Sequence, residues 1–216
     1  YVMNMYSGGE PIDIEFSVHD LNRNKDADAV EAYAYDAAGA VVGRGSLQDD
    51  GGVADMSSAA RSFKLVTPAL KPGAYRLEFK ANDDIITDSI ATRQSKLSFV
   101  GRIWLAETGR SDMNIYTDAA ALTAQTAAAA SKQAIAFDGR ILDITQTYTQ
   151  FKTEAADHSR RSKEIKLKRD GVILAADGVF AFSPDALFDP SPRQLGTDGL
   201  SEASDLNYVI ARYTPG

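Results

Sequence analysis

Cysteine is absent from this 216-residue chain, and histidine occurs only twice, as His19 and His158. Without cysteine the chain has no disulfide framework, thiol nucleophile, zinc–cysteine site or iron–sulfur cluster. A Ser-His-Asp arrangement would need one of the two histidines, and no G-x-S-x-G sequence supplies its serine. No run approaches 18 consecutive apolar residues, the length expected of a transmembrane helix. These absences leave no sign of cysteine chemistry or of direct membrane insertion.

Other signatures of catalysis and of nucleic-acid binding are also missing. Gly43-Arg44-Gly45 lacks the third glycine and the following helix that a dinucleotide site requires. With 23 Lys and Arg against 30 Asp and Glu, the formal net charge is −7, which disfavours binding to nucleic acid. A glycosidase needs two facing carboxylates and aromatic sugar platforms. The single tryptophan, Trp104, lies in a predicted strand, where we expect it in the core. We therefore predict that the chain is not an enzyme.

The dominant period of the sequence is two, which is typical of half-buried β-strands. Strands are predicted at residues 12–19, 30–35, 40–42, 63–66, 75–80, 96–100, 101–106, 113–117, 141–151, 164–168, 172–175, 179–182 and 207–213. Asp177-Gly178, between two apolar runs, indicates a short hairpin. Residues 118–131 are rich in alanine, which favours a helix, but they lack a clear helical stripe, so a short helix and a loop both remain open.

These strands predict an all-β fold of two tandem antiparallel β-sandwich domains, residues 1–100 and 101–216. The boundary is placed after Val100, where the residue pattern of the sequence changes. One large sandwich with an internal insertion is the alternative. The chain begins at Tyr1 without a basic and apolar leader, so we expect a mature piece of something longer.

A Pro-Gly turn precedes a tyrosine that opens a strand, in the run Leu70-Lys-Pro72-Gly73-Ala-Tyr75. This pattern resembles the tyrosine corner of immunoglobulin-like and fibronectin type III-like domains. The resemblance implies that the ring of Tyr75 packs in the core and its hydroxyl bonds to a nearby backbone group. A plain turn followed by a core tyrosine is the alternative.

Oxygen-bearing side chains recur at alternate positions after the first predicted strand. They are Asp20, Asn22, Asn24, Asp26 and Asp28, followed by Glu31. Calcium takes six to eight oxygen ligands, and such a loop is able to wrap the ion. Lys25 replaces the glycine that an EF-hand needs, and the flanks are strands, so we expect an oxygen-rich loop between strands instead. A solvated loop without an ion is the alternative.

A second acidic run, Leu47-Gln-Asp49-Asp50-Gly51-Gly-Val-Ala-Asp55, resembles the L-x-D-D-G-x-x-x-D segment of certain bacterial extracellular immunoglobulin-like domains. The likeness covers roughly residues 12–80. It implies a secreted or surface-anchored protein and adds Asp49, Asp50 and Asp55 to the candidate Ca²⁺ ligands. The acidic ligand expected further along is replaced within 57–61, and an Asp-Gly turn is the alternative.

A third acidic group follows the Tyr75 strand, as Asn82, Asp83, Asp84 and Asp88. Because alternate connections of a sandwich gather at one end, the loops at 20–28 and 81–88 are expected to meet and pool their carboxylates. Such crowding recruits a cation or raises a carboxyl pKa.

Two segments of the second half have competing interpretations. Phe180, Phe182, Leu187 and Phe188 either plug the core and the sandwich end or contact a neighbouring domain or subunit. The basic residues either form a solvated loop and strand face or meet an acidic partner. They are Arg160, Arg161, Lys163, Lys166, Lys168 and Arg169.

The sequence as a whole predicts a non-catalytic structural or interaction module of a larger prokaryotic cell-surface or secreted protein, with calcium as the one cofactor suggested. Its expected partners are other domains or subunits of the same assembly, and its expected location is extracellular. The alternative is a ligand- or carbohydrate-binding accessory module of a secreted enzyme. Because sandwich folds host many unrelated functions, the fold alone does not decide between these roles.

Overall fold

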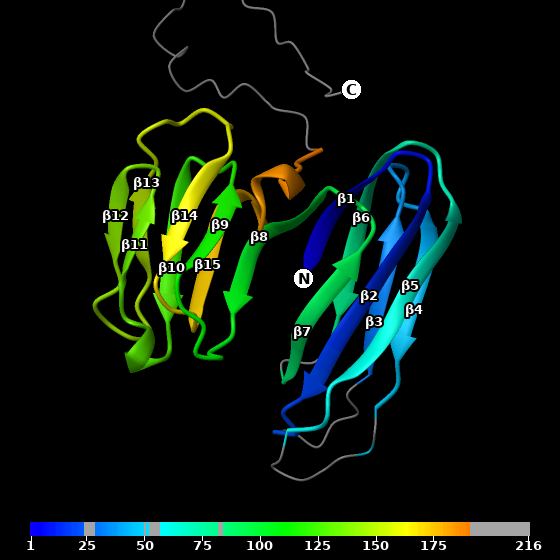
Figure 1. Cartoon of the computed structure of the whole chain (residues 1–216), viewed down its shortest axis with the longest axis horizontal. Helices are drawn as coiled ribbons and strands as arrows, with labels where there is room; N and C mark the ends of the chain where they lie inside the picture. The colour runs from blue at the N-terminus through cyan, green and yellow to red at the C-terminus, as the bar shows by residue number, and fades with distance from the viewer. Residues whose placement is uncertain (24–28, 50, 52–56, 82–83, 191–216) are drawn as a thin grey trace, which may run out of the picture.

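The computed structural model describes residues 1–23, 29–49, 51, 57–81 and 84–190 (Figure 1). Within these residues the chain forms fifteen strands and two short 3₁₀ turns, with no α-helix. All strand pairs are antiparallel. The prediction of an all-β antiparallel fold is confirmed.

The strands fall into one large sheet and one small sheet. The strands of the first half are β1 (Val2–Ser7), β2 (Pro11–Asp20), β3 (Val30–Tyr35), β4 (Val41–Leu47), β5 (Arg61–Ala69), β6 (Gly73–Lys80), β7 (Ile85–Thr92) and β8 (Leu97–Leu105). Those of the second half are β9 (Met113–Thr117), β10 (Ala121–Thr126), β11 (Ala134–Phe137), β12 (Arg140–Asp143), β13 (Phe151–Glu154), β14 (Lys163–Leu167) and β15 (Val172–Ala181). The 3₁₀ turns are η1 (Ala129–Ser131) and η2 (Pro184–Ala186). The large sheet runs β12-β11-β14-β9-β15-β8-β1-β6-β3-β4, with β10 on β15 and β13 on β10, and the small sheet is β5-β2-β7.

A first hydrophobic core lies between the small sheet and strands β1, β3, β4 and β6. Every second side chain of β2 is buried, from Ile12 to Val18, as the period of two predicts. The rings of Phe16 and Phe63 stack with centroids 5.1 Å apart, and the ring of Phe79 packs against both at a tilt. Burial of one such ring stabilises the fold by about 1.5–3 kcal/mol.

Tyr75 makes the contact that its sequence pattern predicts. The side chain is buried, and its hydroxyl donates to the Lys71 carbonyl at 2.7 Å. A buried phenol needs such a partner because an unmet hydroxyl costs free energy. This bond fixes the Pro72-Gly73 turn against the strand that follows it.

A second hydrophobic core is enclosed by strands β8 to β15. Strand β15 changes one partner along its length, because it pairs β10 over residues 172–175 and β9 over residues 180–181, while it stays paired with β8 over 172–175 and 179–180. The change of partner coincides with a register shift between Ala175 and Val179. The predicted hairpin at Asp177-Gly178 is wrong, since the strand bends there by a bulge and continues.

Strand β8 joins the two cores without a break. Its first residues pair with β1 and its later residues pair with β15, and Phe99 packs against both cores. In Figure 1, β1–β7 and β9–β15 form two groups with β8 between them. The boundary predicted near residue 100 falls inside this strand and stays a prediction.

The segment after β15 is bonded back onto β8. The Ser98 hydroxyl donates to the Ala186 carbonyl at 3.2 Å and accepts the Phe188 N–H at 2.6 Å. The Phe188 ring meets the edge of Tyr6 in β1 at 5.9 Å. Phe188 therefore contacts the first half of the chain, and Phe180 is in the second core, whereas Phe182 is exposed.

Two further segments differ from their predictions, and a third lies outside the residues that the structure describes. Residues 118–131, for which a short helix and a loop were both open, contain strand β10, whose Leu122, Ala124 and Thr126 alternate inward, and only their end forms the 3₁₀ turn η1. The strand predicted over 141–151 is split between β12 and β13, with the exposed Tyr148 at a φ of 56° between them. The strand predicted at 207–213 lies outside the described residues.

Candidate functional site

The end of the first core where β2 stops holds three buried oxygen-bearing side chains. Asp20 is 1% exposed, Asp84 3% and Asn22 6%. The Asn22 N–H donates to Asp20 Oδ1 at 2.6 Å, and the Arg23 N–H donates to Asp84 Oδ2 at 3.1 Å. Both carboxylates thus accept N–H groups of one turn, in which Asn22 has a φ of 52°, a conformation that asparagine tolerates.

The structure brings the described parts of the two acidic loops together. The Leu21 N–H donates to the Asp84 carbonyl at 3.1 Å, so the start of β7 lies beside the end of β2. Asp88 does not join this group, because its Oδ1 lies 2.7 Å from His19 Nδ1 on the more exposed face. Asp84, which the sequence placed only near the candidate ligands, is therefore part of the cluster.

The other candidate ligands are not gathered at this place by the described residues. Asp49 is only partly buried, and its Oδ1 accepts the Gly51 N–H at 3.0 Å, which is the turn contact of the alternative interpretation. The remaining candidates lie outside the described residues: Asn24, Asp26, Asp28, Asp50 and Asp55. Their role as ligands stays a prediction.

Metal and membrane features are limited in the part of the chain that the structure describes. No group of three or more His, Cys, Asp or Glu side chains there is close enough to hold a metal ion. The cluster at Asp20 consists of two carboxylates and one amide. No helix within the same residues is long and apolar enough to cross a membrane.

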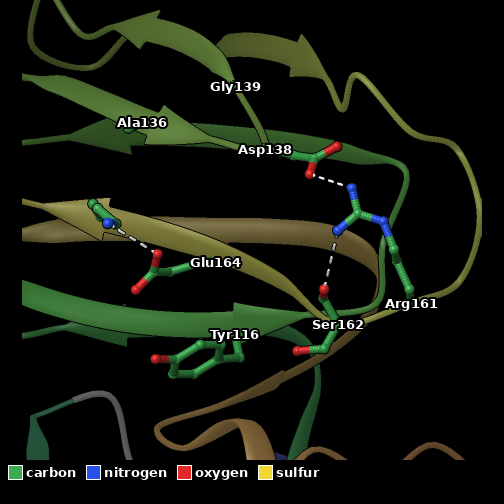
Figure 2. A pocket seen from close by; sticks show the side chains of 8 residues that line it. Tyr116, Ala136, Asp138, Gly139, Arg161, Ser162 and Glu164 are labelled. Atoms are coloured by element: carbon green, nitrogen blue, oxygen red, sulfur yellow. Dashed lines mark hydrogen bonds and ion pairs between the residues drawn. The ribbon is translucent and has the colours of Figure 1, made fainter.

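A shallow polar depression of about 580 Å³ lies on the second half, over β9, β11 and β14 (Figure 2). Arg161 stands at its edge and holds Asp138 with its Nη2 at 2.6 Å, while its Nε bonds to Asp157. The hydrogen bond from Arg161 holds the pKa of the Asp157 carboxyl below its usual range. These groups satisfy one another, and Tyr116 and Glu164 line the same depression, which fits a braced loop rather than a reactive centre.

Lys163 is buried, although the sequence placed it in a basic group that is either solvated or in contact with a partner. It is 1% exposed, and its Nζ donates to the carbonyls of Asp118 and Arg161, both at 3.4 Å, and of Ser159. Burial lowers the pKa of this ammonium. Its position was foreseeable, because Lys163 is in phase with the inward Ile165 and Leu167 along β14.

Four of the other basic residues are exposed, as the interpretation of a solvated loop and strand face predicts: Arg161, Lys166, Lys168 and Arg169. Several of these basic residues also make contacts within the chain. Arg160 lies within 4 Å of Asp118, Asp177 and Asp189, and Arg169 donates to the Ala130 carbonyl at 2.7 Å. Most of these basic side chains therefore contact carboxylates or carbonyls of the same chain.

Trp104 is not in the core, contrary to the prediction. It lies in β8 beside the inward Ile103 and is 54% exposed. Across the sheet it pairs with Ile173 of β15, which pairs in turn with Gln125 of β10. The alternation of β8 was enough to place this residue, because Trp104 is in phase with the exposed Arg102, whereas Ile103 is in phase with Leu97 and Phe99.

Comparisons with protein-family models, with curated proteins and with solved structures found no match.

Proposed function

We propose that this chain is a non-catalytic structural module of a larger prokaryotic cell-surface or secreted protein. In this proposal the two cores are two tandem β-sandwiches, the first of them immunoglobulin-like. Its partners are other domains or subunits of the same assembly. The resemblance of the acidic run to extracellular domains and the Tyr75–Lys71 bond support the extracellular and immunoglobulin-like parts of the proposal.

The observation that carries the proposal is the way the two cores are joined. Tandem domains ordinarily move relative to each other through an exposed linker. Here β8 passes from one core to the other as a paired strand, and Ser98 fastens the segment that follows β15. A spacer that holds its two ends at a fixed separation requires this kind of rigid connection.

Rigidity is measurable by pulsed electron spin resonance between two spin labels, because the chain has no cysteine of its own. Labels at Val66→Cys and Ile141→Cys, exposed positions on the two halves, are expected to give one narrow distance distribution. The reference pair Val41→Cys with Arg93→Cys, within the first half, gives the width that the labels alone produce. A broad or double distribution for the first pair only would contradict the spacer role.

A second candidate function is carbohydrate binding, and the exposed Trp104 favours it. An exposed indole on a strand face, next to Ile173 and Gln125, offers an apolar platform with a polar neighbour. This arrangement is the one expected of an accessory module of a secreted enzyme.

Trp104 is the only tryptophan, so its fluorescence reports directly on this face. If the face binds sugar, cellohexaose or N-acetylchitohexaose should change the emission, and Trp104→Ala should abolish binding measured by calorimetry. Tyr148→Ala, which removes an aromatic ring that is 80% exposed elsewhere, should leave binding intact. Absence of binding to both oligosaccharides would remove the support that Trp104 gives to this candidate.

A further inference from the structure

Asp20 carries a buried oxygen that the described residues leave unmet. Its side chain is 1% exposed, and Oδ1 accepts the Asn22 N–H. Oδ2 is sealed from solvent and accepts no hydrogen bond from any described group. A buried carboxylate oxygen in this state is costly unless a donor or a cation compensates it.

Two well-buried carboxylates of the described chain that lie outside this cluster, Asp170 and Asp118, are bonded differently. Asp170 Oδ2 accepts the Thr108 N–H at 2.7 Å, the Thr108 hydroxyl at 2.6 Å and the Arg110 N–H at 2.9 Å. Asp118 Oδ1 accepts the Val179 N–H at 3.0 Å, and Oδ2 faces Arg160. Asp20 departs from this pattern.

The surroundings of Asp20 are rich in oxygen. Asn22 Oδ1 and Asp84 Oδ1 are also sealed from solvent, and both side chains belong to the same turn through the Asn22–Asp20 and Arg23–Asp84 bonds. Two carboxylates and an amide carbonyl are ligands that hard divalent cations prefer, whereas zinc favours nitrogen and sulfur. The backbone bonds hold both carboxylates in place before any ion arrives.

We propose that Asp20, Asn22 and Asp84 bind a divalent cation of the calcium class at this end of the first core. The ion compensates Asp20 Oδ2 and ties the end of β2 to the start of β7. This ligand set keeps two residues of the sequence prediction and adds Asp84. It does not depend on the spacer role, since a binding module would gain the same stabilisation.

The test compares thermal unfolding in millimolar CaCl₂ and in excess chelator. The intact chain is expected to melt several degrees higher with calcium, because a ligand that binds only the folded state raises its stability. Asp20→Asn and Asp84→Asn should each lose most of this shift. In chelator, Asp20→Asn should melt at or above the wild type, because the substitution removes a buried charge for which the described residues supply only the Asn22 N–H.

Asp49→Asn is the matched control, since it removes one carboxylate from the other acidic run and should keep the full calcium shift. Calorimetric titration of the intact chain with CaCl₂ provides a readout that does not depend on the folding of any variant, and saturable binding is expected. Identical melts in the two buffers with no binding heat would overturn the proposal. So would a shift that survives in Asp20→Asn and Asp84→Asn or disappears in Asp49→Asn.

Discussion

Replacing Lys163 with Met is expected to lower the free energy of unfolding by about 2–3 kcal/mol and the melting temperature by about 5–10 °C. Methionine nearly conserves the volume, so packing in the second core is kept. The carbonyls of Asp118, Ser159 and Arg161 lose their common donor. Part of this cost is offset, because methionine does not require a buried ammonium to give up its water. Denaturant unfolding followed by circular dichroism measures the difference.

The same substitution should release the loop that precedes β14, because Lys163 holds that loop by two of its carbonyls. Trypsin is then expected to cut after Arg160 or Arg161 faster than in the wild type. Lys166→Met is the matched control, since its side chain is on the same strand but 62% exposed, and its effect should stay within about 0.5 kcal/mol. Equal stability of the Lys163→Met and Lys166→Met variants would show that the buried ammonium contributes nothing to the fold.

Gly45→Ala is expected to destabilise the first core by about 2 kcal/mol or more. A Cβ at residue 45 would lie 2.4 Å from the carbonyl oxygen of Lys64 and 2.9 Å from its carbonyl carbon. These are backbone atoms of β5, so no side-chain rotation relieves the overlap. Alanine lowers the conformational entropy of the unfolded chain, and this effect stabilises the folded state by only about 0.4–1 kcal/mol. The gain is smaller than the cost of the overlap.

Gly73→Ala gives the comparison for this prediction, because a Cβ at residue 73 meets no atom within 4 Å. Its melting temperature should equal or slightly exceed that of the wild type. If Gly45→Ala were as stable as Gly73→Ala, the close approach of β4 to β5 would not constrain the sequence. The Gly43-x-Gly45 pair, which fails as a phosphate-binding loop, has its explanation in this approach, since a Cβ at Gly43 would also lie 2.6 Å from Thr67 Cγ2.

Many of the strands were predictable, because a strand with one solvent-exposed face and one buried face alternates polar and apolar residues with a period of two. Strand β2 shows this clearly, with alternate burial along its whole length. Strands with a weak alternation of polar and apolar residues were not predictable in this way. In β10, alanine and threonine differ little in hydrophobicity, so their order does not indicate which face is buried. The pairing of β10 with β13 and β15 decides it.

The candidate site shows the same limit. The alternating oxygens after β2 are visible in the sequence, but alternation does not say which of them are buried. Burial of Asp20 and Asp84 depends on the pairing of β2 with β7, whose residues are separated by more than 60 positions in the chain. Only this pairing distinguishes them from Asp88, which is equally acidic and faces His19.

By itself the sequence determined the all-β class, the tyrosine bond at the Pro72-Gly73 turn and the absence of cysteine chemistry. These follow from local periodicity, turn residues and composition, each of which acts within a few residues. The tertiary structure decided that β15 continues through Asp177-Gly178, that Asp20 and Asp84 are buried together at one end of the first core, and that the Lys163 ammonium meets the Asp118 carbonyl. Each of these outcomes depends on which distant strand lies alongside, because pairing partners and facing layers fix the direction of a side chain.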